Sequence, residues 1–175
     1  DIMLFSTEGK ATRFNEGQVR AMGRTARGVR GINLASGHKL ISLIVPKESG
    51  RILTVTENGY GKRTENAEFP AKGRGGKGVI AMSTSEGNGS RVGAVQVWDG
   101  DEMMLISNQG TAVRTRVDEV SLLGRNTQGV RVIRTRDGEA LVSVSRIAED
   151  DDAAEPVQPV VTDENSDSGS NETEE

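Results

Sequence analysis

The chain of 175 residues contains no cysteine. This absence excludes disulfide bonds, thiol catalysis and cysteine-ligated zinc, and it fits a protein of a reducing cytosol. Only five residues are aromatic, namely Trp98, Tyr60 and three phenylalanines. A chain so poor in rings is a weak candidate for a surface that stacks the bases of single-stranded DNA or RNA.

Long hydrophobic runs are also missing. The longest apolar segments are far too short to span a bilayer, and no secretory signal opens the sequence. We therefore expect no membrane partner and a cytoplasmic location. The first residue is Asp1 rather than methionine, which suggests a fragment of a longer protein.

Basic residues are absent after Arg146. Residues 1–146 hold all 22 Lys and Arg together with 15 acidic residues, a net charge of +7, whereas residues 147–175 carry −11. Residues 149–175 have no aromatic and few branched apolar side chains, so they cannot bury enough surface to offset the entropy lost on ordering. We predict a disordered acidic tail there. It either only adds solubility or folds over the basic part of the chain and competes with a polyanion at contact distance.

The rest of the chain repeats one pattern three times, at residues 1–50, 51–100 and 101–148. Glycines and arginines recur at a spacing of 50 and then 51 residues, which is the period of a repeat architecture rather than of chance. The matching columns are Gly9, Gly59 and Gly110; Arg13, Arg63 and Arg114; Val19, Phe69 and Val120; the Gly-Arg pairs at 23, 73 and 124; and the Gly-Val pairs at 28, 78 and 129.

Each repeat is typical of four short strands, which predicts an all-β protein. Four strands at a period near 50 residues indicate one blade of a propeller-type fold, so three repeats form an arc rather than a closed ring. Asn58-Gly59 predicts a type I′ hairpin turn. The predicted first strands include 2–5 and 52–55, the second lie near 10–14, 61–64 and 111–115, the third begin at the Gly-Val pairs, and the fourth are 40–45, 92–97 and 141–147, with a helical turn expected within 18–22, 68–72 and 117–122.

The stretch GRGGKG, residues 73–78, invites a nucleotide-binding interpretation that the sequence does not support. A phosphate-binding Walker loop needs Lys and Ser or Thr where Val79 and Ile80 stand, and it leads into a helix. The same loop also recurs as GRTARG at 23–28 and GRNTQG at 124–129, whereas a cofactor site is seldom copied into every blade. We therefore expect no cofactor bound by these residues.

Two interpretations of the repeated loop remain open. In one, the glycines serve a tight connection that needs positive φ, and the arginine is solvated or paired with an acid. In the other, the loops and the cations around them line one rim as a basic track for a polyanion, with backbone N–H groups and cationic side chains both meeting phosphate. The candidate DNA-binding residues are Arg20, Arg24, Arg27, Arg30, Lys72, Arg74, Lys77, Arg125, Arg131 and Arg134, and the loop glycines are Gly23, Gly28, Gly73, Gly75, Gly76, Gly78, Gly124 and Gly129.

Such a track favours double-stranded DNA bound without sequence specificity and bent along the rim. A protein-interaction propeller is the alternative from another class. It gives the basic excess no role, and its Trp-Asp signature occurs once, at Trp98-Asp99, without repetition.

The segments VRAMGRTARGVRGI, NGYGKRT and VRTRVDEVSLLGRNTQGVRVIRT resemble the C-terminal domain of the bacterial DNA gyrase A protein. The resemblance implies a β-pinwheel of six blades that exchange strands and wrap DNA, of which residues 1–148 are about the last three. It also implies that the domain supports ATP-dependent negative supercoiling by an A2B2 complex with the gyrase B protein. Residues 72–78 lack the opening Gln-Arg of the gyrase box, which leaves the A-type protein of topoisomerase IV as an alternative.

No residue of the chain is predicted to be catalytic. By the resemblance, the catalytic tyrosine of the family lies upstream, and Tyr60 follows a hairpin turn where the other repeats have Lys10 and Thr111. His38 has no second metal-ligand type near it, so we expect it to be solvated. The resemblance also implies that ATP and Mg²⁺ are used by the rest of the enzyme, and that this part alone is not an enzyme.

Overall fold

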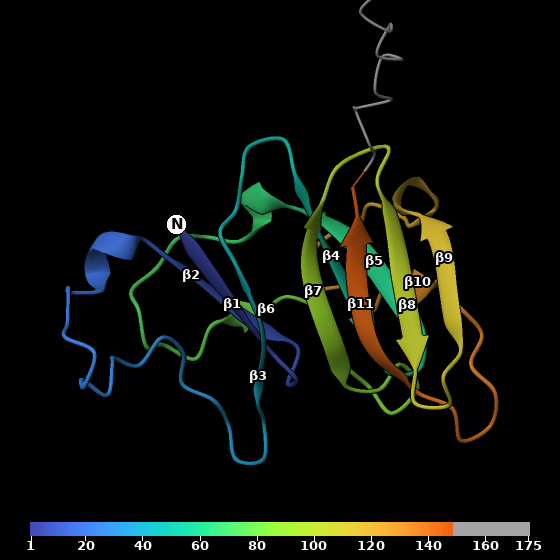
Figure 1. Ribbon diagram of the computed structural model, residues 1–175, viewed down its shortest axis with the longest axis horizontal. Helices are drawn as coiled ribbons and strands as arrows, with labels where there is room; N and C mark the ends of the chain where they lie inside the picture. Colours follow the sequence, from blue (N-terminus) through green and yellow to red (C-terminus); the bar gives the residue numbers. More distant parts are fainter. Residues whose placement is uncertain (149–175) are drawn as a thin grey trace, which may run out of the picture.

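The structure is a computed structural model that describes residues 1–148. The predicted acidic tail, residues 149–175, lies outside the described residues. Three antiparallel sheets follow one another along the chain, as Figure 1 shows, and this confirms the predicted all-β class and its propeller-like blades.

The strands follow the three sequence repeats. The first repeat forms β1 (Ile2–Ser6), β2 (Lys10–Phe14) and β3 (Leu40–Ile44); the second forms β4 (Arg51–Thr56), β5 (Tyr60–Glu65), β6 (Val79–Ile80) and β7 (Arg91–Val97); the third forms β8 (Glu102–Ser107), β9 (Ala112–Arg116), β10 (Val130–Arg131) and β11 (Leu141–Ile147). The predicted helical turns are short 3₁₀ turns, η1 (Glu16–Gln18), η2 (Asn66–Glu68) and η3 (Val117–Glu119). The first two turns begin two residues earlier than predicted.

The short third strands leave their own repeat. The sheet orders are β3-β1-β2-β6, β10-β5-β4-β7 and β11-β8-β9. Strand β6 therefore completes the sheet of the first repeat, with Val79 opposite Ala11, and β10 completes the sheet of the second, with Val130 opposite Gly61. Strand exchange between neighbouring blades, implied by the resemblance, is present at both junctions.

The third strand predicted at Gly28-Val29 in the first repeat is wrong. Within residues 1–148 the backbone there forms no strand. The equivalent segments β6 and β10 pair with the second strand of the repeat before their own. Among residues 1–148, the second strands β2 and β5 are already paired with β6 and β10, and none lies beside Val29.

The hairpin at Asn58-Gly59 is not a type I′ turn. Gly59 has φ of 79°, but within residues 1–148 Ser49 is the one non-glycine residue with positive φ, so Asn58 lacks the conformation that a type I′ turn requires. The loop has three residues, and the N–H of Gly59 donates to the Thr56 carbonyl at 3.1 Å. A Cβ at position 59 would lie 2.3 Å from the Ile133 carbonyl oxygen, so glycine also lets the next repeat approach.

The hydrophobic core lies between repeats as well as within them. Phe69 of the second repeat is buried with Met3, Phe5 and Ala11 of the first, and its ring meets Phe5 edge to face at 5.8 Å. Val117 and Val120 of the third repeat are buried with Leu53 and Val55 of the second. Strand β7 packs against both β3 and β11. Each repeat therefore buries apolar surface of its neighbour, which no isolated blade could do.

Candidate nucleic-acid interface

The arginine of the second Gly-Arg loop is bonded to the first repeat. The Arg74 guanidinium donates through Nε to the carbonyl of Gln18 at 3.1 Å and through Nη1 to the carbonyl of Arg30 at 2.6 Å. The Arg74 backbone N–H donates to Gln18 Oε1 at 2.8 Å. The side chain thus clamps its loop to the turn η1 of the preceding repeat.

Arg125 repeats this clamp one junction later. Its Nε donates to the Glu68 carbonyl at 3.1 Å, its Nη1 donates to the Ile80 carbonyl, and its backbone N–H donates to the Glu68 carboxylate at 2.6 Å. Both arginines are half-buried. For Arg74 and Arg125, the geometry favours a structural role over a free cation on the rim, and their contact with DNA stays a prediction.

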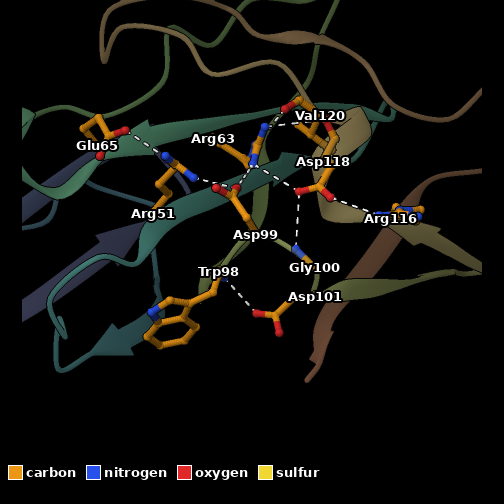
Figure 2. Close-up of polar contacts among 10 residues, drawn as sticks. All are labelled: Arg51, Arg63, Glu65, Trp98, Asp99, Gly100, Asp101, Arg116, Asp118 and Val120. Atoms are coloured by element: carbon orange, nitrogen blue, oxygen red, sulfur yellow. Dashed lines mark hydrogen bonds and ion pairs between the residues drawn. The ribbon is translucent and has the colours of Figure 1, made fainter. Parts of the chain in front are cut away.

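A second pair of equivalent arginines, Arg13 and Arg63, bonds each repeat to the next one. Arg13 donates through Nη1 to the carbonyls of Asn66 and Phe69 at 3.0 and 3.3 Å. Arg63 donates through Nε to the carbonyl of Val120 at 2.8 Å, next to η3 (Figure 2). The repeat pattern revealed this column but assigned it no function. Each arginine bonds the turn of the next repeat and not the turn that follows it in its own, so no pattern within one repeat indicated these contacts.

Carboxylates neutralise the cations around Arg63. Asp99 lies 2.6 Å from Arg51 and 2.8 Å from Arg63, and Asp118 lies 3.2 Å from Arg116 (Figure 2). The hydrogen bond from Arg51 holds the pKa of Asp99 below its usual value and raises the pKa of Arg51 in turn. Asp99 of the Trp98-Asp99 pair is therefore part of this ion-pair network, and the cations of the network are already matched within the chain.

Lys62 is a contact of the third Gly-Arg loop that the sequence reasoning missed. Its side chain is fully buried, yet Nζ donates to the carbonyls of Gly124, Arg125 and Thr127 at 2.7, 2.7 and 3.0 Å. Burial, and then the nearby charge of Arg91, lowers the pKa of Lys62 to about 8. A strand of the second repeat thus fixes the Gly-Arg loop of the third. The alternation of β5 placed Lys62 on the buried face, and this was the only sequence signal.

Only some of the predicted loop glycines have the positive φ that favours glycine. The last glycine of each loop has positive φ, at 80°, 75° and 81° for Gly28, Gly78 and Gly129. A Cβ at Gly78 or Gly129 would lie 2.5 or 2.7 Å from a carbonyl oxygen of the preceding repeat, so these glycines allow the exchanged strand to dock. Gly75 also has positive φ, at 81°. The other loop glycines, Gly23, Gly73, Gly76 and Gly124, do not have positive φ.

The remaining candidate cations stay exposed. Within residues 1–148, none of these eight forms an ion pair with a carboxylate. The loops at 73–78 and 124–129 lead into β6 and β10, which occupy the same edge of successive sheets, opposite β3 and β7. The first loop leads into no strand but lies against the second, where the N–H of Gly75 donates to the Gly31 carbonyl at 2.8 Å. The set consists of Arg20, Arg24, Arg27, Arg30, Lys72, Lys77, Arg131 and Arg134.

Comparison with known proteins gives the family. A family model described as "DNA gyrase C-terminal domain, beta-propeller" matches residues 1–47, 50–97 and 101–148. The chain belongs to this family. The DNA gyrase A protein of Pseudomonas aeruginosa is 58% identical over 85% of this chain, and that of Klebsiella oxytoca is 60% identical over the same share. The matches cover 16% and 17% of those proteins, so this chain spans about a sixth of the relatives' length.

Comparison with solved structures distinguishes the gyrase domain from the topoisomerase IV alternative. A structure of the DNA gyrase A C-terminal domain matches with a TM-score of 0.77 and 33% identity, over 84% of this chain and 50% of that one. The C-terminal domain of a DNA topoisomerase IV matches with the same TM-score but 25% identity, over 83% and 46%. The gyrase resemblance is confirmed, and topoisomerase IV fits less well.

His38 is exposed and contacts the Thr7 hydroxyl at 3.2 Å through Nδ1. Across residues 1–148, no group of three or more metal-ligating side chains comes together, and no helix is long and apolar enough to cross a membrane.

Proposed function

We propose that this chain binds double-stranded DNA without sequence specificity and bends it along the edge formed by β6, β10 and the Gly-Arg loops. The observation that carries the proposal is the set of eight exposed cations without a carboxylate partner in residues 1–148. Unmatched cations on one edge attract phosphates by releasing their counterions. Arg63, Arg74 and Arg125 instead bond to carbonyls across the junctions, where they hold the repeats together.

The family gives this binding a place in a larger reaction. We propose that the DNA is wrapped here as part of the gyrase A protein, and that wrapping supports negative supercoiling by an A2B2 assembly with the gyrase B protein in the bacterial cytoplasm. ATP, Mg²⁺ and the DNA-cleaving residues belong to the rest of that assembly in this proposal. The identity of close to 60% with gyrase A over residues of all three repeats supports it.

The first prediction is that binding is steeply salt-dependent and favours long duplexes. We expect the full chain to bind a duplex of about a hundred base pairs more tightly than short ones, with log K falling against log salt by about 0.9 per phosphate contacted. Gel shifts across a salt series measure both quantities. Weak binding by the folded chain at low salt would favour the protein-interaction propeller instead.

Matched charge removals locate the interface. Lys77→Gln with Arg134→Gln removes two cations from the proposed edge and should lower the salt slope by about 1.8, at about 0.9 per lost contact. Lys39→Gln with Lys47→Gln removes the same charge beside β3, at the opposite edge, and should leave the slope nearly unchanged. Equal losses from both pairs would mean that net charge, rather than this edge, attracts the DNA.

A further inference from the structure

The junction of the second and third repeats carries a cation that is held in a set orientation. Arg131 on the exchanged strand β10 lies opposite Tyr60 on β5, so the pair joins the third repeat to the second. Arg131 Nη2 donates to the Tyr60 hydroxyl at 3.0 Å, and its guanidinium carbon lies 5.1 Å from the centre of the Tyr60 ring. Both a hydrogen bond and a cation–π contact therefore fix the side chain.

Arg131 keeps its charge available while it is held. Its partner Tyr60 is a phenol and not a carboxylate, and within residues 1–148 no carboxylate pairs with Arg131, which is exposed. A guanidinium offers five N–H donors in a planar fork, of which this contact uses one. The others can meet the two oxygens of a phosphodiester.

The backbone beneath this arginine is also fixed. Arg131, Val132, Ile133 and Arg134 line one shallow hollow, so a second cation stands beside the first. The N–H groups of Val132 and Ile133 donate to the Gly59 carbonyl at 2.8 and 3.2 Å. The hollow is thus tied to the hairpin turn of the second repeat, next to Tyr60.

The first junction lacks this arrangement. Lys10 and Ile80 occupy the positions of Tyr60 and Arg131, and Ile80 is an exposed apolar residue. The buried ammonium of Lys62, which holds the Gly124–Thr127 loop at the second junction, is replaced by Thr12 at the first. The two junctions therefore offer DNA unequal contacts.

We propose that Tyr60 is a positioning residue that holds Arg131 for a DNA phosphate, which makes the second junction an anchor from which the duplex bends. The inference rests on the proposed DNA binding. A cation that is already oriented loses less side-chain entropy on binding, so the same charge gives higher affinity. Stacking of a base on Tyr60 is not part of the proposal, because Arg131 covers one face of the ring.

Tyr60→Phe tests the positioning role with little change of shape. It removes the hydroxyl, keeps the ring and leaves the net charge unchanged. We expect the dissociation constant of the full chain for a duplex of about a hundred base pairs to rise about threefold to tenfold, the cost of ordering one long side chain on binding. The salt slope should stay as in the wild type, whereas Arg131→Gln should lower it by about 0.9.

A double-mutant cycle distinguishes positioning from general damage. If Tyr60 acts through Arg131, Tyr60→Phe has no further effect in the Arg131→Gln background. Unchanged affinity of Tyr60→Phe, or an equal loss in both backgrounds, overturns the positioning role and leaves DNA binding standing. A wild-type chain that fails to bind the duplex at low salt overturns both proposals. Thermal unfolding of each variant confirms that the compared proteins are folded.

Discussion

Replacing Phe69 with alanine is expected to lower the free energy of unfolding by about 3 to 5 kcal/mol, the usual cost of emptying a buried aromatic site. Phe69 is 1% exposed and packs edge to face on Phe5, which belongs to the preceding repeat. The variant therefore opens a cavity between two blades. Urea unfolding of the full chain, followed by circular dichroism, measures the loss.

The repeat itself supplies the control for this substitution. Val19 occupies the column of Phe69 in the first repeat, but it is 37% exposed. Val19→Ala should therefore change stability by less than about 0.5 kcal/mol, as surface substitutions usually do. A similar loss from both variants would show that the column matters within each repeat and not at the junctions.

Raising the pH from about 8 to 10.5 is expected to increase the contribution of Lys62 to stability by about 3 kcal/mol. In the folded chain burial lowers the pKa of Lys62 to about 8 from its ordinary value of 10.5. Below pH 8 both states hold the proton. Between the two values the unfolded chain binds more protons, so the free energy of unfolding rises with pH, and above 10.5 the dependence ends.

Lys62→Met isolates this contribution, because methionine fills a similar volume without titrating. The difference in unfolding free energy between wild type and variant should be constant up to pH 8 and then rise in favour of the wild type. Urea unfolding at a series of pH values measures it. A difference that stays level, or falls, between pH 8 and 10.5 would contradict a buried ammonium whose charge is costly.

The sequence predicted the features that each repeat specifies locally. Alternating apolar residues gave strands such as Leu141–Ile147 at the predicted bounds, and the three copies reinforced one another. The errors arise where a segment needs another repeat. Val29 has no strand to join within residues 1–148, and the turn before Gly59 takes a conformation that also accommodates Ile133 from the next repeat.

The candidate site was predicted from the repeated Gly-Arg loops and the cations around them, and this pattern does not report which cations are already bound. Arg74 and Arg125 share a column with exposed Arg24, yet their guanidinium groups bond to carbonyls of the preceding repeat. Lys62 was passed over because a lysine in a strand is usually solvated. Such contacts join residues more than forty positions apart, which periodicity within one repeat cannot reveal.

The exchanged strands also affect how the chain folds during synthesis. The first sheet is incomplete until Ile80 has left the ribosome, and the second waits for Arg131. The sheets of the first two repeats therefore cannot be completed until part of the next repeat has been synthesised. Until then the open edge of β2 or β5 is exposed. Once both edges are filled, no described repeat can unfold without taking a strand from its neighbour or leaving one behind.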